Sequence, residues 1–87
     1  MKTHDLKCWP IYFRPMRSGN KTFEVRKNDR GYQPGDLLVL HEWDQATQRY
    51  SGNRIIAGPV TFIGYDLPGL QNGYVAMCFA ELRFLDA

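Results

Sequence analysis

Lysine, glutamate and arginine stand at close spacing in the segment 19–30, which reads GNKTFEVRKNDR. Lys21, Glu24 and Arg26 would place an ammonium, a carboxylate and a guanidinium near one another. Lysine and arginine bind phosphate, whereas a carboxylate accepts hydrogen bonds from a base or a ribose. These residues suggest a nucleotide or nucleic-acid site, although an exposed Glu24–Arg26 ion pair, contributing about 0–1 kcal/mol to stability, would explain the same spacing.

The element that carries these residues has the pattern of a half-buried strand. From Lys21 onward apolar and polar residues alternate, so we expect Phe23 and Val25 to face the core. Glu24 and Arg26 would then face away from the core, on the same side of the strand as each other. The spacing predicts that this polar face continues to the rim of the fold.

A turn follows the strand and adds further candidates. Asn28, Asp29 and Gly31 are typical of a tight, hydrogen-bonded turn. Such a turn would bring Arg30 to the same rim, where it could meet phosphate, and Asn28 could read the polar edge of a base. We also expect His4 to form hydrogen bonds or to titrate at this rim.

A second carboxylate stands in the apolar segment 37–43, LLVLHEW. Glu42 shares a strand face with Leu38 and Leu40, so it would point into the interior near the mouth of the fold. A buried carboxylate needs a cation or a donor, unless strand twist returns it to solvent. The partners that we expect are Lys7, Lys21 or Arg26.

Two tryptophans stand beside polar residues at the ends of segments. Most aromatic residues in so small a domain belong to the core, but Trp9 and Trp43 are the better candidates for stacking on a base, and we include Trp43 in the site. His4, Cys8, His41 and Cys78 match no closed zinc spacing. We therefore expect no metal and no cofactor, and two buried, reduced thiols.

The charge is divided unevenly along the chain. Of the 87 residues, 1–30 hold eight Lys or Arg against three acids, a formal charge of +5, whereas 31–87 hold three against six, a formal charge of −3. An anionic partner for the first third would suit this division, as would simple solvation. The length and composition predict a single domain over 1–87, and the absence of a signal-like or membrane-spanning segment predicts a soluble, cytoplasmic protein, by default a monomer.

The remaining pattern is mostly that of strands. A helical segment with apolar residues up to Met16 would end at Gly19, but Pro15 predicts two short turns or a kink within it. The segment 33–36, QPGD, has the chemistry of a type II turn. Pro59 predicts a bulge or a bend. Strands are expected at 4–8, 21–26, 37–43, 54–65 and 74–84, with polar connections at 45–53 and 66–73.

Five or six strands with one or two short helices and several Gly or Pro bends predict a mainly β fold, a small closed or partly closed barrel. Gly19, Lys21, Glu24 and Arg26 form the pattern GxKxxExR, which resembles the signature of ASCH domains in the PUA-like superfamily. More closely, 4–7 (HDLK), 18–44, 50–52 (YSG), 69–70 (GL) and 73–75 (GYV) resemble the DUF3850 family of small bacterial and phage proteins.

The resemblance implies a PUA-like β-barrel with a cleft between barrel and helix that binds RNA or a nucleotide-like ligand. Carried over by position, its site residues are Lys21, Glu24 and Arg26, with His4, Lys7, Asn28, Asp29 and Arg30 as neighbours.

One ASCH-like branch hydrolyses acylated cytidine with a lysine, a threonine and a glutamate. Lys21 matches that lysine, but Glu24 stands where that branch has its threonine, and Thr22 lies on the other face of the strand. An amidohydrolase, which would use Lys21, Glu24 and Glu42, is therefore the alternative. A protein-binding accessory factor is a third possibility.

Overall fold

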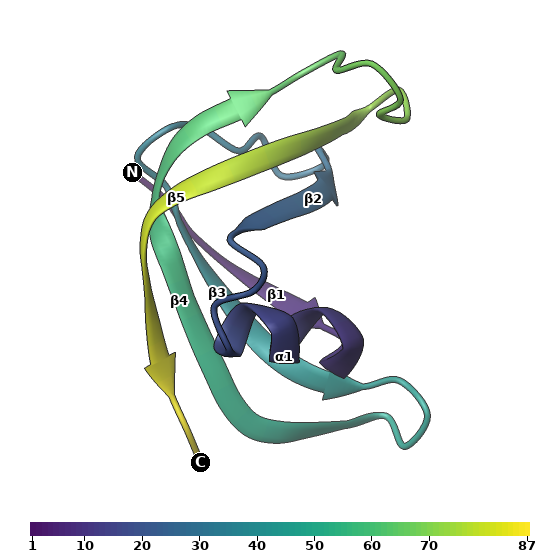
Figure 1. Ribbon diagram of the computed structural model, residues 1–87, viewed down its shortest axis with the longest axis vertical. Helices are drawn as coiled ribbons and strands as arrows, with labels where there is room; N and C mark the ends of the chain where they lie inside the picture. The colour runs from purple at the N-terminus through teal and green to yellow at the C-terminus, as the bar shows by residue number, and fades with distance from the viewer.

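A computed structural model describes the whole chain, residues 1–87. One short helix and five strands follow one another in the sequence (Figure 1). They are β1 (Thr3–Cys8), α1 (Pro10–Arg17), β2 (Phe23–Lys27), β3 (Leu37–Asp44), β4 (Arg49–Gly64) and β5 (Tyr74–Leu85). No helix is long and apolar enough to cross a membrane.

The five strands form one sheet in the order β1-β3-β4-β5-β2. β1 runs parallel to β3, and every other neighbouring pair is antiparallel. Figure 1 shows that β4 and β5 are long and strongly bent, so that the sheet curls around α1 and β2 as a half-barrel. The predicted mainly β, partly closed barrel with a short helix is confirmed, and β1 and β2 are the two edges that no backbone ladder joins.

The bend in β4 follows from Gly58 and Pro59, as the sequence predicts. Gly58 has a φ of +154°, and a Cβ there would lie 2.6 Å from Cδ2 of Leu37 and 3.1 Å from the carbonyl oxygen of Asp36. The register of β4 against β5 shifts between Val60 and Phe62. Glycine is therefore required where β4 crosses closely over the start of β3.

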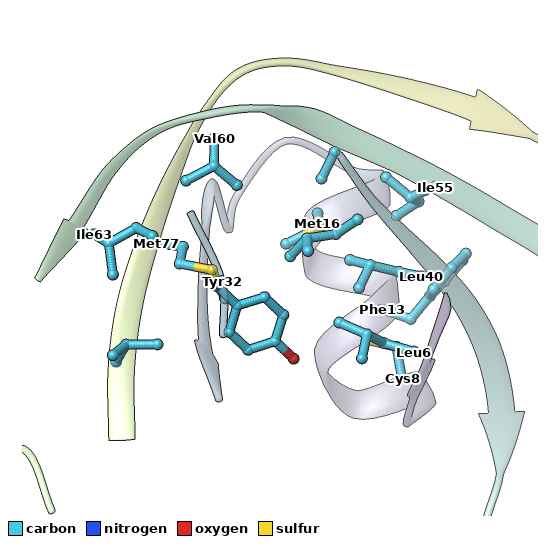
Figure 2. Packing of buried hydrophobic residues seen from close by; sticks show 13 residues of the cluster. Leu6, Cys8, Phe13, Met16, Tyr32, Leu40, Ile55, Val60, Ile63 and Met77 are labelled. Atoms are coloured by element: carbon cyan, nitrogen blue, oxygen red, sulfur yellow. The ribbon is translucent and has the colours of Figure 1, made fainter. Parts of the chain in front are cut away.

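A core of thirteen buried residues lies on the concave side of the sheet (Figure 2). Inward residues of the strands, such as Leu40 and Met77, meet Phe13 and Met16 from α1. The core also takes in Tyr32 from the connection between β2 and β3. The helix thus acts as the lid that a half-open barrel of this size needs to exclude water from its apolar side chains.

Three local predictions about α1 and the turns can be compared with the structure. Pro15 lies inside one helix rather than between two turns, because an eight-residue helix gives up only one backbone hydrogen bond to it. Gly19 has a φ of +87° and ends the helix, as predicted. Gly35 has a φ of +94°, and the N–H of Asp36 donates to the carbonyl of Gln33 at 3.1 Å, which confirms the 33–36 turn.

Two further predictions are wrong. β4 begins at Arg49, inside the polar connection predicted for 45–53, because backbone pairing with the end of β3 outweighs its polar composition. Cys78 is exposed, since it lies on the outer face of β5, whereas Cys8 is buried; both thiols are free.

Candidate functional site

The face of β2 that lies inward is the polar one, so the prediction that Phe23 and Val25 face the core is wrong. Glu24 is only 3% exposed, whereas Phe23 and Val25 are 47% and 42% exposed. The register explains this inversion. Glu24 lies opposite Met77, which is fully buried on the inner face of β5, and directly opposed residues of an antiparallel pair share a face.

The three charged residues singled out by the sequence converge in space. Nζ of Lys21 lies 2.5 Å from Oε1 of Glu24, and Nε of Arg26 lies 2.7 Å from Oε2 of the same carboxylate. The side chains of Lys21 and Arg26 are 15% and 24% exposed. We call Lys21, Glu24 and Arg26 the charged cluster; its buried carboxylate is compensated on both oxygens, as a buried charge must be.

Arg26 also links the two edges of the sheet. Its Nη2 donates to the carbonyl oxygen of Lys7 on β1 at 2.8 Å, which is the one hydrogen bond between β1 and β2. These contacts use two of the five N–H groups of the guanidinium, and Lys21 uses one of its three. Both cations are thus held in place while keeping donors available on the partly exposed side.

Tyr32 lies beside the charged cluster and was not among the sequence candidates. Its side chain is 1% exposed, and Figure 2 shows its ring within the core, with the hydroxyl directed away from Met77 and Val60. No protein group forms a hydrogen bond with this hydroxyl. Burial raises the pKa of Tyr32, and the nearby Arg26 and Arg30 oppose that rise.

Arg30 is one of the charged residues near Tyr32. Arg30 makes no hydrogen bond or ion pair, yet its charge lowers the pKa of Tyr32, as the charge of Arg26 does. The carboxylates of Asp29 and Glu24 raise that pKa. Because no buried side-chain oxygen of the protein lacks a hydrogen-bond partner, the Tyr32 hydroxyl, which has none among protein groups, reaches solvent, and Arg30 is a cation near it. The only sequence signal for Tyr32 was its place between the turn at 28–31 and the turn at 33–36, which does not reveal where the ring points.

Cys8, on the last position of β1, is a second residue that the sequence did not single out for this site. Burial raises the pKa of its thiol to about 11. Glu24 acts in the same direction, Arg26 and Lys21 act against it, and Glu42 adds to the rise. The thiol therefore stays protonated at neutral pH, which makes it a poor nucleophile.

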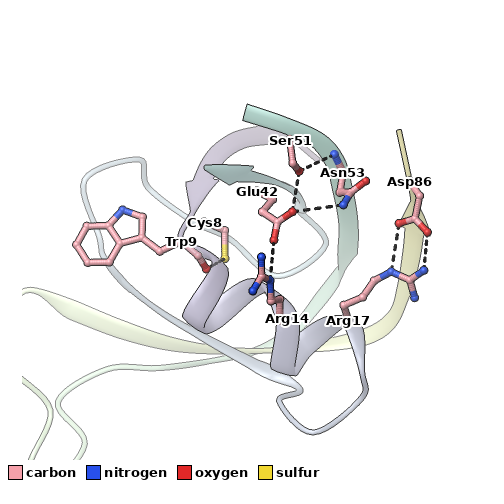
Figure 3. Close-up of polar contacts among 8 residues, drawn as sticks. All are labelled: Cys8, Trp9, Arg14, Arg17, Glu42, Ser51, Asn53 and Asp86. Carbon is pink, nitrogen blue, oxygen red and sulfur yellow. Dashed lines mark hydrogen bonds and ion pairs between the residues drawn. The ribbon is translucent and has the colours of Figure 1, made fainter. Parts of the chain in front are cut away.

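Glu42 points inward, as its face of β3 predicts, but its partners differ from those expected (Figure 3). Oγ of Ser51 and Nδ2 of Asn53 donate to Oε1 at 2.7 and 3.3 Å. Nε of Arg14, from α1, lies 3.5 Å from Oε2. The partners of Glu42 thus come from β4 and α1, and they are not the expected Lys7, Lys21 or Arg26.

His4 lies at the other end of β1 and forms part of a separate polar contact. Its Nε2 lies 2.9 Å from Oδ2 of Asp36, which also accepts a hydrogen bond from the backbone N–H of Gln33, while Oδ1 accepts one from the backbone N–H of Lys2. Burial acts to raise the pKa of Asp36, but these hydrogen bonds outweigh it and hold the pKa at about 2. The rings of His4 and Tyr32 meet edge to face with their centres 4.8 Å apart, so His4 helps to hold the Tyr32 ring in place.

The remaining candidates are spread over other surfaces. Lys7 and Trp43 lie together on the outer face of the sheet, where Nζ of Lys7 is 4.1 Å from the centre of the Trp43 ring. Asn28 lines a hollow of about 200 Å³ together with Tyr65, Asp66, Gly73, Tyr74 and Val75. The charged cluster lines neither this hollow nor the larger one, of about 290 Å³, on the outer face.

Comparison with known proteins gives a family and a phage relative. A family model described as "Domain of unknown function (DUF3850)" matches residues 3–79. The chain is also similar to the "Uncharacterized 12.9 kDa protein in GpA 3'region" of Escherichia phage P2, with 41% identity over 56 residues. That alignment covers 64% of this chain and 50% of the phage protein, so the chain spans about half the length of that relative.

Proposed function

Because this chain belongs to the DUF3850 family, whose description assigns no function, we propose a function from the charged cluster itself: it binds RNA or a nucleotide-like ligand. The observation that supports this is the pre-organised pair of cations. Lys21 and Arg26 are fixed by Glu24 and still keep unused N–H donors. Fixed donors bind phosphate with little further loss of side-chain entropy.

Two neighbours extend the cluster toward a ligand. Arg30 supplies a third cation, and the Tyr32 hydroxyl, which has no protein partner and reaches solvent, can donate to or accept from a base or a sugar. Each oxygen of Glu24 has one protein donor and can accept another. In this proposal, Lys21, Arg26 and Arg30 meet phosphate, and Glu24 with Tyr32 contacts the nucleoside. A PUA-like relationship, which the half-barrel is compatible with, belongs to the same proposal.

Salt dependence of RNA binding tests the proposal. If three phosphates are contacted, the log–log slope of affinity against salt for a mixed-sequence single-stranded RNA should be near −2, since each contact adds about −0.7. Arg30→Ala should weaken binding and lower the slope by about 0.7, as measured by fluorescence anisotropy of a labelled oligonucleotide.

Lys27→Ala is the matched control, because Lys27 lies exposed on the outer face of β2, the strand that carries Glu24 and Arg26. It removes the same charge without touching the cluster and should leave affinity nearly unchanged. Binding without salt dependence, or equal losses in Arg30→Ala and Lys27→Ala, would contradict the proposal. A stoichiometric protein recovered in a pull-down without nucleic acid would favour the accessory-factor alternative.

The amidohydrolase alternative, with Lys21, Glu24 and Glu42 as its catalytic groups, has less support because a nucleophile is missing. Thr22 is exposed and makes no hydrogen bond to the cluster, and the Cys8 thiol has a pKa of about 11. Incubation with N4-acetylcytidine separates the two functions. Release of cytidine that Lys21→Gln abolishes would favour hydrolysis over binding.

A further inference from the structure

A group of aromatic and charged side chains covers the outer face of β1, β3 and β4. Asp5 and Lys7 occupy the outward positions of β1, and His41 and Trp43 occupy those of β3. Trp43 lies directly opposite Tyr50 of β4 in the register. We call these five residues the outer aromatic patch; they lie on the reverse side of the sheet from the core.

Contacts within the outer aromatic patch hold its rings in fixed orientations. The Tyr50 ring meets Trp43 edge-on at 4.6 Å and His41 edge-on at 6.0 Å. Nε2 of His41 lies 2.8 Å from Oδ1 of Asp5, and Lys7 lies over the Trp43 ring. The only carboxylate of the patch is thus engaged by a histidine, and the aromatic rings are ordered without a ligand.

The patch encloses a hollow and leaves one ring accessible. Asp5, Leu6, Lys7, His41 and Tyr50 line an open hollow of about 290 Å³. Tyr50 is 55% exposed, although its ring lies against both Trp43 and His41. A hollow of this size lies at the small end of the roughly 300–1,000 Å³ of small-molecule sites, which suits a single base or nucleotide.

We propose that the outer aromatic patch stacks one base of a single-stranded nucleic acid, with Tyr50 as the stacking ring. Charge complementarity favours this occupant. Lys7 is a cation at the hollow, and Arg54, which is exposed and lies opposite His41 in the register, is another beside it. Aromatic platforms flanked by such cations bind single strands with little sequence preference.

The inference rests on the proposed function and adds a second contact surface to it. Lys7 connects the two surfaces, since its carbonyl is bound by Arg26 and its side chain belongs to the patch. A strand that reaches the charged cluster can therefore continue over the β1 edge to Tyr50. An oligonucleotide should use both surfaces, whereas a mononucleotide can occupy only one.

Tryptophan fluorescence gives a local readout, because the chain has only Trp9 and Trp43. In Trp9→Phe protein, the remaining emission comes from Trp43, which contacts Tyr50. Titration with oligo(U) and oligo(dT) of eight nucleotides should quench that emission until it saturates. The quenching should occur over the same concentration range in which fluorescence anisotropy detects binding. Binding of both oligonucleotides without any change in Trp43 emission would overturn the inference.

Variants of Tyr50 separate this inference from the proposed function. Tyr50→Ala should weaken oligonucleotide binding about five- to 150-fold, the usual range for the loss of one stacked base, whereas Tyr50→Phe should bind like the unchanged protein. Tyr65→Ala is the matched control, since Tyr65 is similarly exposed, at 51%, but lies beyond the end of β4.

The outcomes are distinguishable. If Arg30→Ala weakens binding and Tyr50→Ala does not, the outer aromatic patch has no role and the charged cluster remains the site. If Tyr50→Ala and Tyr65→Ala weaken binding equally, the effect is not local and the inference is wrong. If no oligonucleotide binds the unchanged protein, both the inference and the proposed function fail.

Discussion

β2 alternates apolar and polar residues, whereas β3 begins with a run of apolar residues, and the two strands turn different kinds of face toward the interior. β3 buries Leu38 and Leu40, whereas β2 buries Glu24 and leaves Phe23 and Val25 on the outside. Alternation therefore identifies the two faces of a strand but not which of them lies inward. In β2 the inward face is decided by pairing with β5 and by the cations that meet Glu24.

The position of each strand in the sheet accounts for the difference. β3 lies between β1 and β4, where apolar side chains of both neighbours surround its inner face. β2 is an edge strand, and its inner face meets the open gap toward β1. At that gap Lys21 and Arg26 remain partly exposed, so a carboxylate can be compensated there without burying two whole cations.

The largest effect should come from the apolar inner face of β3. Leu40 is fully buried, so Leu40→Ala should lower the free energy of unfolding by about 4 kcal/mol through lost burial and the cavity left behind. Urea unfolding measures this change. A loss below about 1 kcal/mol would mean that the core around Leu40 collapses freely, and the contrast with β2 would weaken.

The inner face of β2 should respond nearly as strongly, but for an electrostatic reason. Glu24→Ala leaves Lys21 and Arg26 close together without their shared carboxylate, and we expect a loss of about 3 kcal/mol. Glu81→Ala, at an exposed position of β5, is the control and should cost less than about 0.5 kcal/mol.

Removing a cation together with the carboxylate sharpens this comparison. In the double variant Lys21→Ala/Glu24→Ala, the loss of stability should be smaller than the sum of the two single losses, since the two side chains contact each other. Additive losses in urea unfolding would show that Glu24 is not held by Lys21.

The buried carboxylate of Asp36 gives a third, pH-dependent effect. Its folded pKa of about 2 lies below the usual aspartate pKa of 3.8, so its stabilising contribution is present above pH 4 and is lost as the pH falls toward 2. The loss should be on the order of 2 kcal/mol. Asp36→Asn should flatten the stability curve between pH 4 and pH 2; an unchanged slope would assign the pH dependence to other carboxylates.

The smallest effect should come from the outer face of β2. Val25→Thr should change stability by no more than about 0.5 kcal/mol, because Val25 is 42% exposed. Val75→Thr makes the same substitution on the inner face of β5, opposite Arg26, where a hydroxyl would be buried at a cost of about 1–3 kcal/mol. Equal effects of the two variants would contradict the assignment of faces.

Local chemistry made much of the fold predictable. Gly19 and Gly35 mark the end of α1 and a tight turn because each adopts a positive φ that other residues avoid. The bend at Gly58 and Pro59 follows from the same kind of local restriction. The start of β4 at Arg49 was missed because pairing with β3, a contact between distant residues, sets it.

The candidate site was predictable only in part. Lys21, Glu24 and Arg26 could be found because they lie within one short segment and converge through neighbouring positions. Tyr32 and Cys8 could not, since what matters for them is the packing of distant strands around each side chain. The outer-face position of Lys7 and Trp43 could not be predicted either, because the sequence does not reveal on which side of the sheet they stand.

The guanidinium of Arg26 links the two edge strands of the sheet and also belongs to the proposed binding surface. Its Nε donates to Glu24 and its Nη2 donates to the carbonyl of Lys7. An anion can therefore approach the remaining N–H groups without breaking the hydrogen bond between β1 and β2. An anion that takes the N–H of Nη2 bonded to Lys7 must break the hydrogen bond that links the two sheet edges. Under the proposed function, the direction of approach would therefore matter, because only the N–H groups of Arg26 that bond neither Glu24 nor Lys7 are open to a ligand oxygen.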